Sequence, residues 1–477
     1  MQISYSMLVC CNALIEADKT AEQIGFKAII KYNKLDFYAF AAMQKPNEAG
    51  REHYMKREQI DKNIVAREQI DKNIVADLRE LAALTSDIDG AQRVAWTPTF
   101  KKATEWFAKK MQAAGAEVWT DAAGNSWAKF AGESEESIVI GSHLDSVPDG
   151  GWLDGALGVV AGMGIGAYGL ADKKPAKTLY VVGWADEEGV AFGKSCLGSS
   201  AVSGIVTSKD VLPLSHQENG RSFSDVWQEY GLDANRIGEA HTAFAKLPVK
   251  AYLELHIEQA PLLALAKKSV ACIYGVCGCN RQYITFRGQQ GHCGSPVALR
   301  QDAFIAAAQT TLDLREIALK YDSYCTVGNI EVKPDLVTIS PGYCRISLDQ
   351  RSIKPETMQT IVAEAKAAAQ KHAQEGKLTV EFEPIWHAEP ILFDEQLVED
   401  CNAAVEEETG ARHSMYSAPL HDAVPLNAVV PSVMMFAQSD PGISHCKEEN
   451  TPQPQLEEAI RAFIRLAEKE LETKFAE

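Results

Sequence analysis

The sequence predicts an α/β fold, in which a mixed sheet flanked by helices carries a smaller inserted α+β domain. Two observations predict the main sheet. Short apolar runs alternate with helical stretches between residues 118 and 255, and polar residues follow directly after several of these runs. A third observation predicts the insertion. In the predicted strands beyond Cys277, apolar and polar residues alternate, and two long predicted helices lie among these strands. The 477 residues are enough for more than one core.

The chain begins with an extension and a helix. Residues 1–56 show no sustained period, and the apolar run 7–15 is short and follows no basic region, unlike a secretory signal. The segment REQIDKNIVA then occurs twice in succession, at 57–66 and 67–76. Ten residues rotate a helical face by about 80°, so the two copies cannot present the same face to one core. We therefore expect the second copy to begin the packed domain and the first to extend its helix outward.

The elements of the main sheet follow in order. The pattern predicts a helix over 97–114, strands over 118–120, 126–130 and 138–140, a helix over 156–169, and strands over 178–184 and 252–255. After the insertion, the chain returns to this sheet with a helix over 394–409, a strand over 433–437 and a final helix over 453–473.

The inserted segment has its own pattern of strands and helices. We expect a strand over 282–288, a helix over 302–319, strands over 324–332, 336–339 and 343–351, a helix over 356–376 and a strand over 378–385. The predicted domains are an N-terminal extension (1–66), the main domain in two parts (67–276 and 389–477) and the inserted domain (277–388).

Charge and composition exclude several classes of protein. The net charge of −18 argues against non-specific binding to nucleic acid or to anionic membranes. No apolar run reaches the ~18 residues that a membrane helix needs. The 11 cysteines are scattered and form no paired CxxC motifs, which is typical of free thiols in a reducing compartment. We therefore expect a cytoplasmic protein without a nucleic-acid or membrane partner.

Residues with metal-ligand chemistry follow the predicted strands. In an open parallel sheet, ligands bind where strands end and helices begin. The positions just past an apolar strand-like run, or in the loop that it feeds, include His143, Asp154, Glu187, Glu188, His256 and His445. Such nitrogen and carboxylate ligands suit zinc or a similar divalent ion. The sequence therefore predicts a metal site at this edge of the sheet.

The adjacent glutamates Glu187 and Glu188 indicate two different roles. Neighbouring side chains diverge, so one carboxylate can bind metal while the other faces a bound water. A metal lowers the pKa of such a water towards ~7, and a nearby carboxylate can then accept its proton. We also expect Asp145 to orient the ring of His143, because a ligating histidine needs a partner for its other nitrogen.

Seven motifs occur in a characteristic order between residue 67 and the C-terminus: GSHLDSVPDGGWLDGALGV, WADEEG, ELHIEQ, GHCGSP, SLDQR, LHDA and GISHCKEE. In these motifs the chain resembles the amidase/hydantoinase/carbamoylase branch of the dinuclear metallo-aminoacylase and carboxypeptidase superfamily. That branch includes N-carbamoyl-L-amino acid hydrolases, β-ureidopropionases and allantoate amidohydrolases. The resemblance implies a metallopeptidase-like catalytic domain and an inserted dimerisation, or lid, domain.

The resemblance also implies two divalent ions per subunit, either zinc or manganese, cobalt or nickel. It assigns His143 and His256 to one ion, and Glu188 and His445 to the other. Asp154 is implied as the ligand that bridges the two ions.

Further roles follow from the same resemblance. Glu187 is implied as general base and acid, and His292 as a residue that reaches the partner subunit's site and steadies the oxyanion. A homodimer held through the inserted domain is implied with it. Arg351 resembles the arginine that binds the substrate carboxylate, and a guanidinium fork suits that task. The remaining substrate positions fall on Gln259, Thr338 and His421.

Three departures from the family pattern lie around the substrate. The GHCGSP turn of His292 is one residue shorter than usual. Thr338 stands where many relatives carry a substrate-binding Asn, and Pro419-Leu420 stand where a Gly-containing loop usually precedes the His-Asp pair. These departures bear on the identity of the substrate more than on the chemistry.

The expected function is hydrolysis of a ureido group: an N-carbamoyl amino acid plus water gives the amino acid, carbon dioxide and ammonia. The expected substrate is thus a small ureido compound with a carboxylate. Three alternatives remain open: an allantoate-type amidohydrolase, a dipeptidase or N-acyl amino acid hydrolase on the same metals, and a non-catalytic binding protein that kept the fold.

Overall fold

Nine strands form the main sheet in the computed structural model, which describes residues 48–171 and 173–475. The predicted extension up to residue 47, with the apolar run 7–15, lies outside the described residues. The described residues from Val65 onward form one unit. Among the described residues, no helix is both long enough and apolar enough to cross a membrane.

The main sheet has the strand order β16-β8-β18-β7-β5-β6-β4-β3, and β17 pairs with β8. The strands are β3 (Glu117–Thr120), β4 (Ser126–Phe130), β5 (Ser134–His143), β6 (Lys177–Trp184), β7 (Val249–Ile257), β8 (Val270–Val276), β16 (Ile391–Leu392), β17 (Ser414–Ser417) and β18 (Ser432–Ala437). The central strands β6, β5, β7 and β18 are parallel, so their carboxyl ends meet at one edge. The predicted mixed α/β sheet is confirmed.

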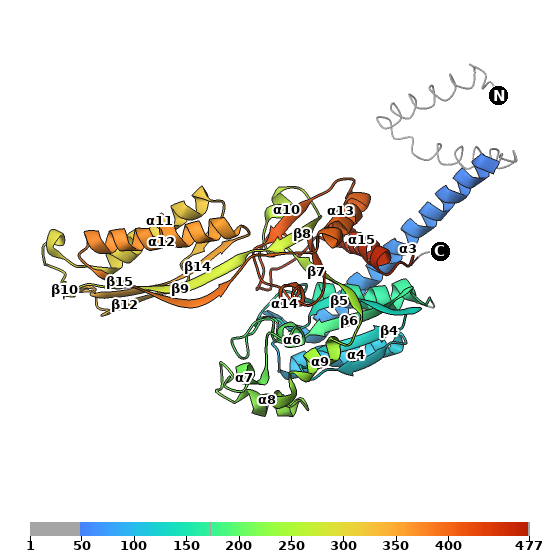
Figure 1. Cartoon of the computed structure of the whole chain (residues 1–477), viewed down its shortest axis with the longest axis horizontal. Coiled ribbons are helices and arrows are strands. Elements are labelled where there is room, and N and C mark those ends of the chain that lie inside the picture. Colours follow the sequence, from blue (N-terminus) through green and yellow to red (C-terminus); the bar gives the residue numbers. More distant parts are fainter. Residues whose placement is uncertain (1–47, 172, 476–477) are drawn as a thin grey trace, which may run out of the picture. The chain divides into compact units, whose positions relative to one another are not determined.

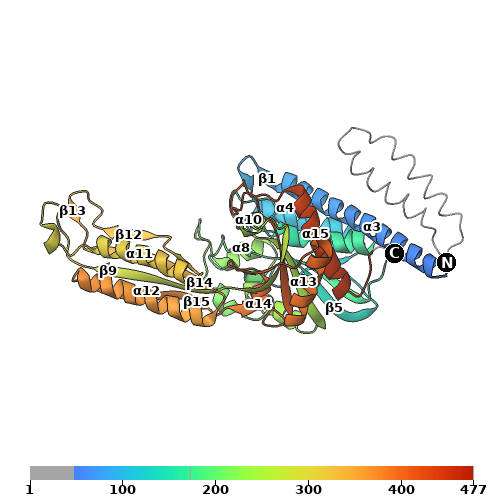
Figure 2. The ribbon, with the colours of Figure 1, turned by 90° about the horizontal axis from the view of Figure 1, so that it is seen from above.

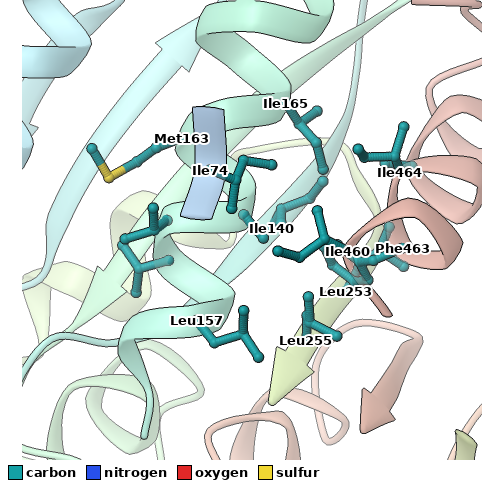
Figure 3. Close-up of a cluster of buried hydrophobic side chains, with 14 of the residues drawn as sticks. Ile74, Ile140, Leu157, Met163, Ile165, Leu253, Leu255, Ile460, Phe463 and Ile464 are labelled. Atoms are coloured by element: carbon teal, nitrogen blue, oxygen red, sulfur yellow. The ribbon is translucent and has the colours of Figure 1, made fainter. Parts of the chain in front are cut away.

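Helices cover both faces of this sheet (Figure 1). One core holds side chains of α3 (Glu48–Thr85), α4 (Pro98–Ala113), α5 (Ala156–Gly164), α13 (Glu395–Thr409) and α15 (Gln453–Glu470). The other holds side chains of α6 (Leu197–Val202), α7 (Ser208–Val211), α8 (Phe223–Glu229), α9 (Glu239–Phe244), α10 (Leu262–Leu265) and α14 (Ala423–Leu426). Figure 3 shows the first core, where Ile140 and Leu253 of the sheet lie near Ile460 of α15.

Helix α3 contains both copies of the ten-residue repeat. In the second copy Ile70, Ile74 and Val75 are buried, and burial continues at Leu78 of the same helix. Figure 2 shows α15 beside α3, and Arg67 of the second copy pairs with Glu468 of α15 at 2.6 Å. The second copy therefore packs as predicted, whereas the side chains of the first copy lie outside the described part.

Residues between β8 and β16 form a second, antiparallel sheet with the order β11-β14-β9-β15, and β12 pairs with β14. Its strands are β9 (Gly278–Arg287), β11 (Tyr324–Thr326), β12 (Ile330–Lys333), β14 (Tyr343–Ser352) and β15 (Thr379–Ala388). Helices α11 (Ala303–Lys320) and α12 (Pro355–Glu375) cover one face, where Phe286 and Ile346 meet Leu314 and Ala369. Two short ribbons pair β1 (Ser86–Asp87) with β2 (Gly90–Ala91), and β10 (Gly291–His292) with β13 (Ile339–Ser340).

Several elements differ from the sequence-based expectations. Strand β8 was not predicted, although its run of apolar residues is almost wholly buried. The strand predicted over 324–332 is two strands, because the chain turns at Gly328 and Asn329, whose N–H groups donate to Ser347. The strand predicted over 336–339 is shorter and later: the paired residues are Ile339 and Ser340, which form β13. The helix predicted over 156–169 ends as a π-helical turn, Ile165–Leu170.

Candidate metal centre

The carboxyl ends of the parallel strands bring the predicted ligands to one edge of the main sheet. His143 is the last residue of β5, and His256 lies one residue before the end of β7. Glu188 follows β6, which lies beside β5 in the sheet (Figure 1). His445 lies in the loop after β18, and Asp154 in the loop that leads to α5. The five ligand-type positions therefore come from five different segments.

Asp154 lies at the centre of this arrangement. Its Oδ1 is 3.2 Å from Nε2 of His256 and 3.9 Å from Nε2 of His143. Its Oδ2 is 3.3 Å from Nε2 of His445, which is in turn 3.5 Å from Oε2 of Glu188. The carboxylate of Asp154 thus faces two separate groups of ligand atoms, one on each oxygen.

The glycine after Asp154 makes this approach possible. Gly155 has a φ of +63°, which favours glycine, and a Cβ atom there would lie 2.4 Å from the His143 ring. Any side chain at residue 155 would therefore push the loop of Asp154 away from His143.

The residues present fit divalent metal ions. Ligand atoms lie within 4.8 Å of one another in the sets His143/Asp154/His256 and Asp154/Glu188/His445. Two atoms of these residues, Nε2 of His256 and Oε1 of Glu188, are buried and have no hydrogen-bond partner among the described residues. Imidazole nitrogens together with carboxylate oxygens form a donor set for zinc and similar ions.

The pKa values of the site residues also indicate a site that can hold a metal ion. Burial and the nearby charge of Asp154 raise the pKa of Glu188 to about 8. Burial and the charge of Glu188 raise the pKa of Glu187 well above its usual range. Burial lowers the pKa of His143 to about 3, so its ring is neutral, which is the form that ligates metal. The carboxylate of Asp154 raises the pKa of His256 and of His445 to about 9, so the crowded carboxylates retain protons in the site, and a divalent ion that binds there takes their place.

Backbone carbonyls orient the two histidine rings at the strand ends. Nδ1 of His143 lies 3.1 Å from the carbonyl oxygen of Asp145, and Nδ1 of His256 lies 2.9 Å from that of Ile257. The carboxylate of Asp145, expected to orient the ring of His143, lies 3.7 Å from its Nδ1 and does not bond it; the backbone carbonyl takes that place. The carboxylate instead accepts hydrogen bonds from the N–H groups of Glu187 (3.2 Å) and Glu188 (3.1 Å). Such contacts fix ligands in place.

A cavity of about 430 Å³ opens above these residues. The predicted ligands and Glu187 line it together with three of the predicted substrate residues; its wall consists of His143, Asp154, Glu187, Glu188, Ser195, His256, Gln259, Arg281, Arg351, Pro419, Leu420, His421, Ser444 and His445. The structure therefore brings most of the predicted site together in one place.

Two predicted substrate residues lie against the ligands. Nε2 of Gln259 donates to Oδ2 of Asp154 at 3.1 Å, while its buried Oε1 has no partner among the described residues. The ring of His421 lies 4.4 Å from that of His256, and its Nε2 is 2.9 Å from the Ser417 hydroxyl.

Arg351 reaches the cavity from β14. Its Nε donates to Oδ1 of Asp349 at 2.9 Å and its Nη1 to the carbonyl of Ala418 at 2.7 Å. Arg281, which sequence reasoning missed, donates to the other oxygen of Asp349 at 2.7 Å and also lines the cavity. No local pattern in the sequence marks Arg281, because its place opposite Asp349 depends on the register of β9 against β14.

His292 and Thr338 do not line this cavity. Both are exposed and lie beside each other at the β10–β13 ribbon, where the carbonyl of Thr338 accepts from the N–H of Cys293 at 2.8 Å. Within one chain, these two predicted site residues are therefore not brought to the ligands.

Comparison with known proteins places this arrangement in context. The sequence model of peptidase family M20/M25/M40 matches residues 139–469. The chain is 31% identical to N-carbamoyl-L-amino acid amidohydrolase of Geobacillus stearothermophilus, over 76% of this chain and 88% of that protein. It is 27% identical to allantoate amidohydrolase of Escherichia coli K12, over 78% and 91% of the two chains.

The fold is also similar to that of a solved structure. The crystal structure of a hydantoinase/carbamoylase family amidase from Burkholderia multivorans superposes with a TM-score of 0.76 at 27% identity. The match covers 83% of this chain and 96% of the amidase.

Proposed function

We propose that this chain, which belongs to peptidase family M20/M25/M40, hydrolyses the ureido C–N bond of an N-carbamoyl amino acid to give the amino acid, carbon dioxide and ammonia. The chain is a hydrolase of a metal-dependent family. One observation carries the proposal: a single cavity holds the ligand-type residues, Glu187 and the guanidinium of Arg351. The names of the two curated relatives above support a ureido substrate.

Two divalent ions, zinc or manganese, cobalt or nickel, complete the proposed site. His143 and His256 would hold one ion and Glu188 and His445 the other, and Asp154, which faces both groups, would bridge them. When bound, such ions polarise a carbonyl oxygen and make water a better nucleophile at neutral pH.

Glu187 is the proposed general base and acid. It is buried beside Glu188, and its Oε2 lies 3.8 Å from Nε2 of His143. The Sγ of Cys196 donates to its Oε1 at 3.4 Å, and the residue lines the cavity. In this position Glu187 can take a proton from the attacking water and deliver it to the leaving nitrogen.

Arg351 is the proposed anchor for the substrate carboxylate. Its Nε and Nη2 donate to Asp349 and its Nη1 to the Ala418 carbonyl, so each of Nη1 and Nη2 keeps one further N–H for a carboxylate in the cavity that Arg351 lines. A guanidinium held in this way binds a carboxylate through two parallel hydrogen bonds. Gln259 and His421, which touch the ligands, would contact the ureido group.

We further propose that His292 and Thr338 act on the site of a partner subunit, in a homodimer formed through the inserted domain. Arg281, near the start of β9, lines the cavity, whereas His292 follows the opposite end of this strand. Arg281 and the last residue of β9, Arg287, are six residues apart, which corresponds to about 20 Å at about 3.4 Å per residue. His292 therefore lies too far along the chain to reach its own cavity, and its exposed position suits action in trans.

The free thiols support a reducing compartment, and we propose the cytoplasm as the place of action. Nine cysteines in the described part of the chain carry free thiols, and most of them are buried. Protein thiols remain reduced in the cytoplasm.

A substrate panel tests the proposed reaction. The metal-loaded protein is incubated with N-carbamoyl amino acids, allantoate, N-acetyl amino acids and dipeptides, and both ammonia and free amine are measured. Ammonia from the N-carbamoyl compounds is the expected result, and ammonia from allantoate alone would favour the allantoate-type reaction. Free amine from acyl substrates or dipeptides, without ammonia from any ureido compound, would contradict the proposal.

A further inference from the structure

We infer that Glu449 is a positioning residue that ties the loop of His445 to the loop of Asp154 and thereby sets the affinity of the site for metal. The inference rests on the proposed metal site and assigns a role to a residue outside the ligand set. Glu449 lies four residues beyond His445 and almost 300 residues from Asp154 in the chain.

The contacts of Glu449 join the two loops directly. Its carboxylate is buried, with 1% of the residue exposed. Oε1 accepts hydrogen bonds from the backbone N–H of Leu153 (3.2 Å) and of Asp154 (3.0 Å). Oε2 accepts one from the hydroxyl of Ser444 (2.5 Å), the residue before His445. The carboxylate of Glu449 thus holds the backbone of Asp154 and the side chain of Ser444, the residue next to His445.

Ser444 extends this tie to the side chains of the site. Its Oγ lies 3.2 Å from Oδ2 of Asp154, and the amide of Gln259 lies 3.4 Å from the same hydroxyl. Glu449 therefore acts on the ligands through hydrogen bonds at both ends, without facing the cavity itself.

His445 is the ligand that most needs such a tie. Its side chain is 50% exposed, whereas the carboxylates of Asp154 and Glu188 are buried. Its backbone has a φ of +58°, which is unfavourable for a residue with a side chain. Packing alone does not fix a half-exposed side chain on a strained loop, and the hydrogen bond of Glu449 to Ser444 holds the residue directly before His445.

The fold leaves room for Glu449 at one glycine. A Cβ atom on Gly151 would lie 2.0 Å from Oε1 of Glu449, so any side chain at residue 151 would displace the carboxylate. Gly151 and Glu449 therefore form a matched pair, and a substitution at either residue should break the same contact.

Metal binding is the readout that separates this role from a purely structural one. Glu449→Ala, Glu449→Gln, Gly151→Ala and the double variant Gly151→Ala/Glu449→Ala are stripped of metal and titrated with Zn²⁺ and with Mn²⁺ against a competing chelator. Elemental analysis gives the number of ions bound. The matched control is Glu468→Ala, which removes a buried carboxylate that bonds Arg67 and the N–H of Phe475, away from the site. Circular dichroism and thermal unfolding monitor the fold of every variant.

We expect Glu449→Ala to weaken binding of the ion at Asp154, Glu188 and His445 by about 10–100-fold, the usual effect of removing a residue that orients ligands. Gly151→Ala should weaken metal binding to a similar extent. The double variant should bind metal no more weakly than Glu449→Ala does, and Glu449→Gln should lose less metal affinity than Glu449→Ala. If Glu449→Ala binds metal as tightly as the wild type, or if Glu468→Ala loses as much metal affinity, the role of Glu449 is overturned but the proposed function is not. Wild-type protein that binds neither ion would overturn the proposed function as well.

Discussion

Asp145 holds the backbone of Glu188: its Oδ2 accepts a 3.1 Å hydrogen bond from the Glu188 N–H, while Oδ1 accepts one from the N–H of Glu187. The residue that follows the proposed ligand His143 by two positions thus fixes the turn that carries the two glutamates. The ends of β5 and β6 are joined at this point, so Asp145 connects the segments of two proposed ligands, His143 and Glu188.

Replacement of Asp145 tests this link. Asp145→Ala should weaken metal binding by about 10–100-fold, because the backbone N–H groups of Glu187 and Glu188 both lose the carboxylate that holds them. Asp394→Ala serves as the control, since Asp394 likewise accepts from two backbone N–H groups, those of Gln396 and Leu397, at the start of α13. Metal titration with a competing chelator provides the measurement, and equal affinities for the two variants would contradict the role of Asp145.

Glu187→Gln tests the proton transfer. The amide keeps the size of the side chain but cannot accept a proton, so kcat should fall by ~10²–10⁴ while KM changes little. Elemental analysis should show the same metal content as in the wild type, because Glu188 rather than Glu187 is the proposed ligand. A variant that keeps its metals and also its full kcat would exclude Glu187 as the general base.

Arg351→Lys tests the recognition of the carboxylate. Lysine keeps the charge but loses the planar fork, so KM should rise by about 10-fold or more, with a smaller change in kcat. Arg345→Lys is a matched control on the same strand, because Arg345 pairs with Glu383 and stacks on Tyr283 outside the cavity.

An amidated substrate completes the test of Arg351. It should be poor for the wild type and little worse for Arg351→Lys, because neither protein can then form the charged contact. If the wild type hydrolyses the amidated and the free substrates equally well, Arg351 does not bind a carboxylate.

Mixed dimers test whether His292 acts across the interface. Glu187→Ala and His292→Ala should each be inactive, but a mixed dimer contains one site with both residues intact. After complete exchange of subunits, the mixture should show about one quarter of the wild-type activity, since half of the dimers are mixed and each has one working site. No recovery, with exchange demonstrated by differently tagged subunits, would count against action in trans.

The placement of His143 and of the Glu187-Glu188 pair at strand ends was predictable, because it depends on local sequence. An apolar run followed by His143, or by the Glu187-Glu188 pair, places these residues at a strand end whatever the rest of the chain does. Arg281 and Glu449 were not predictable in this way. Arg281 reaches the site through the register of β9 against β14, and Glu449 through a contact with a loop almost 300 residues away. Such long-range contacts leave no periodic signal in one sequence.

The same distinction applies to the fold. The parallel strands β5, β6 and β7 follow from their apolar runs and from the helices between them. Strand β8 escaped prediction because its run ends at Cys277, where the change in pattern indicated a domain boundary instead of a further strand of the main sheet. Its pairing with β18 and β17 depends on residues more than 130 positions away.

The most direct test of metal-dependent ureido hydrolysis is ammonia release from an N-carbamoyl amino acid by the same protein with and without metal. The protein is stripped with a chelator, its metal content is verified by elemental analysis, and Zn²⁺, Mn²⁺, Co²⁺ or Ni²⁺ is then returned. We predict no ammonia from the metal-free protein and release after at least one ion is restored. Full ammonia release by protein verified to be free of metal would contradict the proposed mechanism.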